Sequence, residues 1–265
     1  MPGHDLALIE KAAREAGAIA RKYFGGHYKQ WDKGKGQPVT EADLEIDRFL
    51  CETLTRARPD YGWLSEESKD DPARLEAEYT FVVDPIDGTV GFMKGKPQFT
   101  IAIAVVRDGA PIAGIVFNPI TEECFAAELG AGATLNGAPI HVSARETIKG
   151  CKMLASKSLL QHKAWDNPPV TPWPPMDIET RSSIAYRMAL VAAGQFDAML
   201  ALSTKHDWDL AAADIILREA GGSVSDHLGR TLRYNGAVPH QPSVVAAGPA
   251  LHARLMEKLI HVRLP

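Results

Sequence analysis

The sequence predicts a mixed α/β protein in two parts, an α+β part up to about residue 145 and an α/β part after it. Four apolar runs lie between residues 79 and 128, and the last three are joined by short turns, which is typical of antiparallel strands. Beyond residue 145, short apolar runs alternate with helical patterns, which is typical of strand–helix units. We therefore expect two sub-domains, residues 1–145 and residues 146–265.

Two helices are expected in the first 60 residues. Apolar residues recur at helical spacing over residues 6–24. After the polar stretch 33–38, Thr40 is placed to cap a second helix that runs through Leu54. Asp43 then lies in the first turn of this helix, where a carboxylate complements the helix dipole.

Strands dominate the rest of the first part, and Asp108-Gly109 and Asn136-Gly137 mark tight turns among them. The expected strands are residues 79–84, 99–107, 111–118 and 123–128.

In the second part, helices and strands alternate. The expected strands are residues 151–156, 197–202 and 243–248, and the expected helices are residues 184–193, residues 209–220 and a last helix from Pro249. The proline-rich segment 167–175 suits neither a helix nor a central strand, so we expect a surface loop there.

Composition excludes several classes of partner. The 265 residues carry a formal net charge of only -4, so the chain lacks the broad cationic field that holds a nucleic-acid polymer. The three cysteines are an odd number and lack the paired spacing of zinc sites or disulfide frameworks, which favours a cytoplasmic location. No uncharged stretch approaches the roughly 18 residues of a membrane span, so we expect no membrane partner.

The string VVDPIDGT, residues 82–89, ends an apolar strand with two acids. Haloacid-dehalogenase-type phosphatases end a strand in D-x-D-G-T, with the first aspartate as nucleophile and the second as general acid. Here Pro85 and Ile86 separate Asp84 from Asp87, so the period-two geometry of a strand cannot place both acids in those positions. The covalent-aspartate interpretation is therefore disfavoured.

A D-x-x-D loop is better suited to binding cations. Asp84, Asp87 and the carbonyl of Ile86 can converge on a hard ion such as Mg²⁺. Gly88 and Thr89 follow directly, and their free N–H groups could hold a phosphate. Metal and phosphate would then meet in one loop.

Other acids stand out by context. Glu66 and Glu67 end a short apolar segment, and Asp209 directly precedes an apolar helical run. Each has a purely structural alternative: Asp43 and Asp209 can complement helix N-termini, and Glu67 can be a solvated surface charge.

The strings VTEADLEID, LSEES, VVDPIDGT and DWDLAAAD follow one another in this order. Together they resemble the motifs of the inositol monophosphatase superfamily, which are Mg²⁺-dependent, lithium-sensitive phosphatases. The resemblance extends from residue 39 to about residue 222. It implies a layered α-β-α-β-α sandwich like that of fructose-1,6-bisphosphatase, an active site between the two parts, inhibition by Li⁺, and a homodimer.

The resemblance also implies roles for the acids in a site with two or three Mg²⁺ ions. Two carboxylates about 4 Å apart repel by roughly 4 kcal/mol at an effective dielectric near 20, so converging acids need compensating cations or protons. Glu66, Asp84 and the Ile86 carbonyl would hold one Mg²⁺, Asp84, Asp87 and Asp209 a second, and Glu67, or Glu66 again, a weaker third. Asp43 and Thr89 would orient and deprotonate the attacking water, and Asp87, Gly88 and Thr89 would contact the phosphate.

The substrate is a small phosphorylated metabolite, and its identity is less constrained. Inositol-specific relatives typically carry a glutamate shortly before the WD motif, whereas residues 202–205 read LSTK here. Arg187 and Lys205 could receive a second phosphate, although Arg187 could also be a helix-surface charge. The loop DGTVGFMKG, however, lacks the charged pair that follows DGT in many nucleotidases.

We therefore expect a 3'(2'),5'-bisphosphate nucleotidase, with inositol-1-monophosphatase as the main alternative. Histidinol phosphate, fructose 1,6-bisphosphate and a catalytically silent metal- or phosphate-binding regulator are further alternatives. His206 lies three residues before Asp209 and is expected to be structural.

Overall fold

The computed structural model describes residues 5–32, 34, 38–156, 173–259 and 261–264. Within these ranges the helices are α1 (Asp5–Tyr23), α2 (Glu41–Ala57), the 3₁₀ helix η2 (Pro72–Glu76), α3 (Thr89–Met93), α5 (Ile184–Ala192), α6 (Asp207–Glu219) and α7 (Pro249–Leu259).

The described strands form two sheets and two short ribbons. The larger sheet has the order β3-β4-β5-β6-β7-β8-β9 and contains β3 (Gly62–Ser65), β4 (Tyr79–Asp87), β5 (Thr100–Arg107), β6 (Ala110–Asn118), β7 (Glu123–Glu128), β8 (Gly132–Leu135) and β9 (Ala138–Pro139). The smaller sheet has the order β11-β10-β12-β16-β14 and contains β10 (Lys152–Leu154), β11 (Asp177–Glu179), β12 (Ala198–Ala201), β14 (Ser223–Ser225) and β16 (Val244–Ala247). The ribbons pair β1 (Gln30–Asp32) with β2 (Pro38–Thr40), and β13 (Lys205–His206) with β15 (His240–Gln241).

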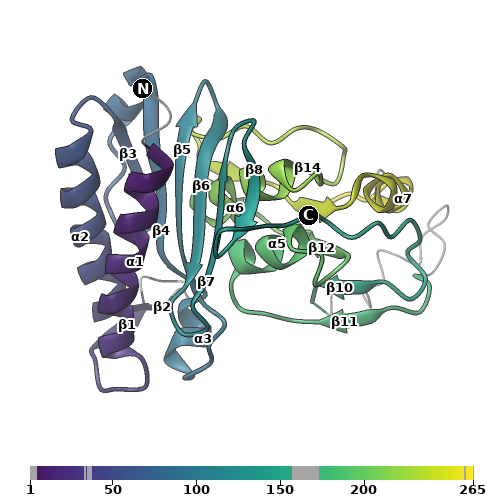
Figure 1. Cartoon of the computed structure of the whole chain (residues 1–265), viewed down its shortest axis with the longest axis horizontal. Coiled ribbons are helices and arrows are strands. Elements are labelled where there is room, and N and C mark those ends of the chain that lie inside the picture. Colours follow the sequence, from purple (N-terminus) through teal and green to yellow (C-terminus); the bar gives the residue numbers. More distant parts are fainter. Residues whose placement is uncertain (1–4, 33, 35–37, 157–172, 260, 265) are drawn as a thin grey trace.

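These elements stack in five layers, as Figure 1 shows. Helices α1 and α2 cover the outer face of the larger sheet, α5 and α6 lie between the two sheets, and α7 lies beyond the smaller sheet. The expected α-β-α-β-α sandwich is therefore confirmed.

The two N-terminal helices are confirmed, and the second begins as its cap residue predicts. The hydroxyl of Thr40 accepts from the backbone N–H of Asp43, while the Asp43 carboxylate accepts from the N–H of Thr40. This reciprocal capping box satisfies two donors that a helix start otherwise leaves open. It also holds the Asp43 side chain at the end of α2, beside strand β2.

The expected antiparallel strands are confirmed as β4 to β7. The sequence did not predict the parallel pairing of β3 with β4, in which Ser65 lies opposite Val83. As a result Glu66, which follows β3, comes next to Asp84, which follows Val83 along β4. The register between β4 and β5 then shifts between Asp84 and Asp87, so the predicted acidic loop is an irregularity at the end of β4.

The expected elements of the second part are also present. The segments expected as strands contain β10, β12 and β16, and the expected helices correspond to α5, α6 and α7. Helix α6 starts at Asp207, two residues before the expected start. Strands β11 and β14, the ribbons, α3 and η2 were not expected. Of the predicted loop 167–175, residues 167–172 lie outside the described residues, and 173–175 are in neither helix nor strand.

Helices α5 and α6 pack on both sheets. Phe125 of the larger sheet, Met199 of the smaller sheet and Leu210 of α6 belong to one buried apolar cluster. We propose that the boundary between the two parts lies near residue 145, because no described strand pairs across the interval from β9 to β10. None of the described helices combines the length and the apolar character that a membrane crossing requires.

Candidate active site and metal centre

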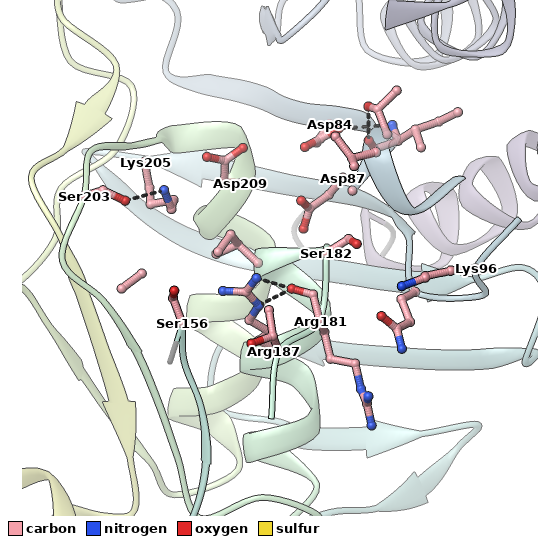
Figure 2. A pocket seen from close by; sticks show the side chains of 18 of the residues that line it. Asp84, Asp87, Lys96, Ser156, Arg181, Ser182, Arg187, Ser203, Lys205 and Asp209 are labelled. Atoms are coloured by element: carbon pink, nitrogen blue, oxygen red, sulfur yellow. Dashed lines mark hydrogen bonds between the residues drawn. The ribbon is translucent and has the colours of Figure 1, made fainter. Parts of the chain in front are cut away.

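Three carboxylates converge where β4 ends and α6 begins. One oxygen from each of Asp84, Asp87 and Asp209 lies within 4.8 Å of the others. Asp84 and Asp87 come from β4 and Asp209 from the first turn of α6, and Figure 2 shows Asp209 lying across from the other two. We refer to Asp84, Asp87 and Asp209 as the carboxylate cup.

The local backbone fixes the two acids of β4. One Asp84 oxygen accepts from the N–H of Ile86 at 3.0 Å, which closes a turn around Pro85. The Ile86 side chain is 1% exposed and belongs to the apolar cluster beneath α1 and α2. Anchored in this way, the turn holds both Asp84 and Asp87 in the carboxylate cup.

Asp87 is also tied to the amino end of α5. Its Oδ2 accepts from the hydroxyl of Ser183 at 2.6 Å and from the N–H of Ala185 at 2.6 Å. Ser183 is itself the N-cap of α5, because its Oγ accepts from the N–H of Tyr186 at 2.8 Å. A carboxylate at this position is favoured by the helix dipole. Ser183 was not among the predicted site residues, although a serine before an apolar helical run is a recognisable capping signal.

Asp209 occupies the third position of α6. Its Oδ2 accepts from the backbone N–H of His206 at 2.9 Å, which is half of a capping box. Asp209 therefore has the predicted structural role at a helix start, and the same side chain is also part of the cup. The ring of His206 stacks on Trp208 at 4.5 Å between centroids.

Burial raises the pKa of every acid in the cup. The pKa of Asp84 is raised well above its usual range, first by burial and then by the charges of Glu66 and Asp87. Burial raises the pKa of Asp87 to about 6, against the lowering effect of Ser183 and the α5 amides. The pKa of Asp209 rises to about 8 through burial and the charge of Asp87. At neutral pH the cup therefore retains protons or recruits cations.

The donor set fits Mg²⁺. The cup offers only carboxylate oxygens, which are hard ligands that repel one another, and Asp84 and Asp87 are buried while Asp209 is half-buried. Glu66 is outside the group of three, but its charge raises the pKa of Asp84, Asp43 and Asp209, which places it close by. Glu66 also lines the adjoining cavity, whereas Glu67 is not among the described residues that line it.

Asp47 holds the loop that carries the two glutamates. Its two carboxylate oxygens accept from the hydroxyls of Ser65 at 2.5 Å and Ser68 at 2.6 Å, so both ends of the Glu66-Glu67 segment are tied to α2. Asp47 was not among the predicted site residues. Its position four residues after Asp43 could have indicated that both acids lie on one face of the helix.

Asp43 and Thr89 meet beside the cup as expected. Thr89 Oγ1 lies 3.1 Å from Asp43 Oδ1 and 3.1 Å from the carbonyl oxygen of Ile86. Burial raises the pKa of Asp43 to about 6, and the hydrogen bonds from Thr40 and Thr89 oppose that rise.

Gly88 makes the turn between the cup and Thr89. It has a left-handed φ of 98°, and a Cβ there would lie 3.0 Å from both the Gln98 carbonyl oxygen and the Ser183 nitrogen. Only glycine fits this backbone without strain.

A cavity of about 920 Å³ opens beside the cup. Its lining includes Lys96, Arg181, Arg187 and Lys205, together with Ser156, Ser182 and Ser203 (Figure 2). One wall is therefore anionic, and the rest of the lining contains cations, hydroxyls and apolar residues such as Leu200 and Leu202. Lys96 and Arg181 were not predicted, because each lies in a loop whose sequence has no motif.

Both predicted cations line this cavity. Arg187 Nε donates to the Arg181 carbonyl at 2.6 Å, and Arg187 Nη2 donates to the same oxygen. Lys205 Nζ donates to Ser203 Oγ at 2.9 Å. Burial lowers the pKa of both Arg187 and Lys205, while the charge of Asp87 raises each. The position of Arg187 on the cavity wall favours substrate binding over the alternative, a helix-surface charge.

Comparison with known proteins agrees with this geometry. The model of the inositol monophosphatase family matches residues 4–263. The chain is 32% identical to an inositol-1-monophosphatase of Rhizobium meliloti, over 98% of this chain and 97% of the relative. It is also 32% identical to a Nus factor SuhB of Xylella fastidiosa, over 84% of this chain and 82% of the relative.

Solved structures show the same likeness. The IMPase of Thermotoga maritima superposes with a TM-score of 0.81 at 27% identity, covering 98% of this chain and 97% of that one. The extragenic suppressor protein suhB of Bartonella henselae superposes with a TM-score of 0.81 at 29% identity, covering 96% of this chain and 98% of that one.

Proposed function

Because this chain belongs to the inositol monophosphatase family and is therefore a phosphoric monoester hydrolase, we propose that it cleaves a small phosphate ester with Mg²⁺ bound at the carboxylate cup. The observation that carries the proposal is the convergence of three carboxylates within 4.8 Å, those of Asp84 and Asp87 buried and that of Asp209 half-buried. They lie on the wall of a cavity whose lining also contains cations, hydroxyls and apolar side chains. A phosphate ester in this cavity would have its reacting group near the acids and the rest of the molecule near the cations.

We assign the metal ligands as the motif resemblance implies. Glu66, Asp84 and the Ile86 carbonyl would hold one Mg²⁺, and the cup would hold a second. For a third, weaker ion the geometry favours Glu66 over Glu67, because Glu66 lines the cavity. When bound, the ions supply positive charge that lowers the pKa of water and offsets charge on the phosphoryl and leaving oxygens. Li⁺ would inhibit by competing for the same oxygens.

The chain's own residues would prepare the attack. The carboxylate of Asp43 accepts from the Thr89 hydroxyl, which leaves the lone pairs of that hydroxyl available to accept from a water in the cavity. With a pKa of about 6, Asp43 is mostly ionised at neutral pH and is suited to take up a proton. The backbone amides of Gly88 and Thr89, in the turn after Asp87, would donate to the phosphate.

The cavity favours a substrate with a second anionic group. Arg187 and Lys205 lie close to each other and to the cup, since the pKa of Lys205 is affected by the charges of Arg187 and Asp209. Leu202 and Ser203 line the cavity. They belong to the segment just before Trp208-Asp209, where inositol-specific relatives typically carry a glutamate. Two cations with no such acid suit a bisphosphate better than a polyol, so we favour 3'(2'),5'-bisphosphate nucleotidase activity.

Inositol-1-monophosphatase is the second candidate, and a specific observation favours it. Relatives that are 32% and 33% identical carry that name. The cavity also offers several hydroxyls, including those of Ser156, Ser182 and Ser203, that could bond to ring hydroxyls. Fructose 1,6-bisphosphate also offers a second phosphate to Arg187 and Lys205 and stays an alternative, whereas histidinol phosphate has neither a second phosphate nor ring hydroxyls. A silent regulator is disfavoured because Asp43, Thr89 and the cup are assembled.

A side-by-side assay tests the proposal. Phosphate release would be measured from 3'-phosphoadenosine 5'-phosphate, inositol 1-phosphate, histidinol phosphate and fructose 1,6-bisphosphate, with Mg²⁺, with Mg²⁺ plus Li⁺, and with EDTA. We expect Mg²⁺-dependent, Li⁺-inhibited release, fastest for the bisphosphorylated nucleotide. A higher kcat/KM for inositol 1-phosphate would select the second candidate. Mg²⁺ binding without release from any ester would support the silent regulator instead.

We also propose that the protein is a homodimer, as the motif resemblance implies. Light scattering on the eluting peak of a gel-filtration column would give its mass, and a monomer would refute this point.

A further inference from the structure

Arg74 is a buried arginine outside the substrate cavity. It lies in η2, its side chain is 1% exposed, and it is not among the described residues that line the cavity. The guanidinium makes four hydrogen bonds: Nε and Nη2 donate to Asp70 at 2.6 and 3.0 Å, Nη1 donates to Asn235 Oδ1 at 2.6 Å, and Nη2 donates to the Gly236 carbonyl at 3.1 Å. A planar fork used in this way fixes its partners in direction as well as in distance.

Asn235 extends this contact in two directions. Its side-chain amide donates to Thr80 Oγ1 on β4 at 2.9 Å, and its backbone N–H donates to Asp207 Oδ2 at 2.7 Å. Asn235 adopts a left-handed φ of 60°, which lets its backbone and side chain serve different partners. Asp207 is the first residue of α6, is 0% exposed, and also accepts from Gln241 Nε2 at 2.9 Å.

Arg74 also touches the strand that leads to Glu66. Gly62 begins β3, and a Cβ on Gly62 would lie 2.9 Å from Arg74 Cβ and 2.8 Å from Thr80 Oγ1. The backbone of β3 is therefore in close contact with Arg74.

Three elements that carry candidate metal ligands thus meet at Arg74. Strand β3 leads to Glu66, β4 carries Asp84 and Asp87, and α6 carries Asp209 two residues after Asp207. In the larger sheet β3 and β4 are joined by strand pairing, whereas helix α6 packs against β4. The bonds from Arg74 to Asn235, and from Asn235 to Asp207, tie the start of α6 to these strands.

We propose that Arg74 is a positioning residue for the metal centre. Through its bond to Asn235, and the bond of Asn235 to Asp207, it fixes the position of the start of α6 relative to β3 and β4. It thereby sets the separation of Asp209 from Asp84 and Glu66. The inference rests on the proposed Mg²⁺ site. Ligand oxygens must be held within narrow limits to bind Mg²⁺ well, because its geometry is close to ideally octahedral. If the start of α6 is held less firmly, Mg²⁺ affinity therefore falls although no ligand is removed.

The test compares Arg74→Met with Arg218→Met. Arg218 lies near the other end of the same helix and bonds to Asp214, a carboxylate that is 1% exposed, so its loss also costs stability but removes no hydrogen bond to Asp207 or Asn235. Mg²⁺ binding to each metal-stripped protein would be measured by titration calorimetry, and the melting temperature in EDTA would be recorded. We expect Arg74→Met to weaken Mg²⁺ binding about 10-fold or more. Arg218→Met should lower the melting temperature with Mg²⁺ binding unchanged.

Asn235→Gly provides a second variant in case Arg74→Met does not fold. Glycine tolerates the left-handed φ and keeps the backbone donor to Asp207, so only the side-chain bonds to Arg74 and Thr80 are lost. It should weaken Mg²⁺ binding in the same direction as Arg74→Met, and in the double variant the two effects should not add. Arg74→Lys, which retains the charge, should recover part of the affinity.

Two results would overturn the proposal in distinguishable ways. If the wild-type protein binds Mg²⁺ and both Arg74→Met and Asn235→Gly bind it as tightly, Arg74 serves the fold alone and the proposed function is unaffected. If the wild-type protein does not bind Mg²⁺, both the metal centre and the positioning role are wrong.

Discussion

The hydroxyl of Thr89 lies 3.1 Å from Asp43 Oδ1, although 46 positions separate the two residues in the chain. Its single proton has a second acceptor, the Ile86 carbonyl at 3.1 Å, so at any moment it is donated to one of the two. Because the other oxygen of Asp43 is held by Thr40, the carboxylate cannot turn away from Thr89. This fixed geometry supports the proposed role of the pair, in which Asp43 and Thr89 would take a proton from a water in the cavity.

Replacing Thr89 tests this pair. We expect Thr89→Ala to lower kcat by about 10²-fold or more, which is the usual contribution of a positioned proton acceptor. Thr89→Ser keeps the hydroxyl and should retain activity within about 10-fold of wild type, with the loss caused by freer rotation of the side chain. Calorimetric Mg²⁺ binding should be similar in both variants. Comparable kcat values for the alanine and serine variants would mean that the hydroxyl plays no part in proton transfer.

Asp87→Asn should separate catalysis from folding. The amide oxygen of asparagine can still accept from Ser183 and Ala185, so the link to α5 survives. A buried carboxylate whose pKa is raised to about 6 is lost, and with it a repulsion in the metal-free cup. We therefore expect a metal-free protein that melts at or above the wild-type temperature at pH 8 and has less than about a tenth of the activity.

Differential scanning calorimetry in EDTA, together with a phosphate-release assay, checks both halves of this expectation. A variant that melts well below wild type would show that the bonds to α5 need the charge. Retention of more than about a tenth of the activity would remove Asp87 from the metal ligands.

The contrast between Asp43 and Asp209 shows how far the sequence could lead. Local patterns place both acids at helix starts, since a capping residue and an apolar run are sufficient to locate a helix N-terminus. Nothing local indicates that both starts lie near the end of β4, because that depends on how α2 and α6 pack on opposite sides of the larger sheet. The convergence was available only from the motif order that the chain shares with a known family.

Glu67 and Lys96 mark what sequence reasoning could not resolve. Glu66 and Glu67 are neighbours in one acidic string, and only the parallel pairing of β3 with β4 decides which of them lies beside Asp84 and lines the cavity. Lys96 lines the cavity from the loop after α3. No periodicity or motif spacing in the sequence predicts this position. The division of the chain near residue 145 stays a proposal.

Metal-free stability should fall as pH rises. The pKa of Asp209 is about 8 in the folded protein and far lower in an unfolded chain, so between those values the folded state binds more protons. Stability that protonated Asp209 contributes is therefore complete at low pH and is lost as pH rises through about 8. Histidines with lowered pKa values, such as His206, act in the opposite direction, but they are already neutral above about pH 7.

The range from about pH 7 to pH 8.5 is therefore the one to measure. We expect the melting temperature in EDTA to fall across it, and the increment given by saturating Mg²⁺ to grow, because the ion binds the ionised carboxylates. Asp209→Asn should flatten the metal-free slope. A metal-free melting temperature that rises over this range would contradict the raised pKa of Asp209.

Arg187 provides the sharpest test of substrate class. Its Nε and Nη2 both donate to the Arg181 carbonyl, and these bonds fix the plane of the guanidinium. Neither bond uses Nη1. Removing the side chain in Arg187→Ala should therefore cost a bisphosphorylated nucleotide a charge-assisted contact worth about 1.5–3 kcal/mol, or roughly 10- to 100-fold in kcat/KM. Inositol 1-phosphate has no second phosphate to lose and should be affected several-fold at most.

Lys96→Ala is the matched control for that experiment, because Lys96 also lines the cavity but comes from the loop after α3. If the second phosphate is bound by Arg187, the lysine variant should affect the two substrates more evenly than the arginine variant does. Equal losses of kcat/KM for both substrates in Arg187→Ala would mean that Arg187 shapes the cavity but does not bind the second phosphate. The preference for a bisphosphate would then lose its support, and the names of the relatives would make inositol 1-phosphate the better candidate.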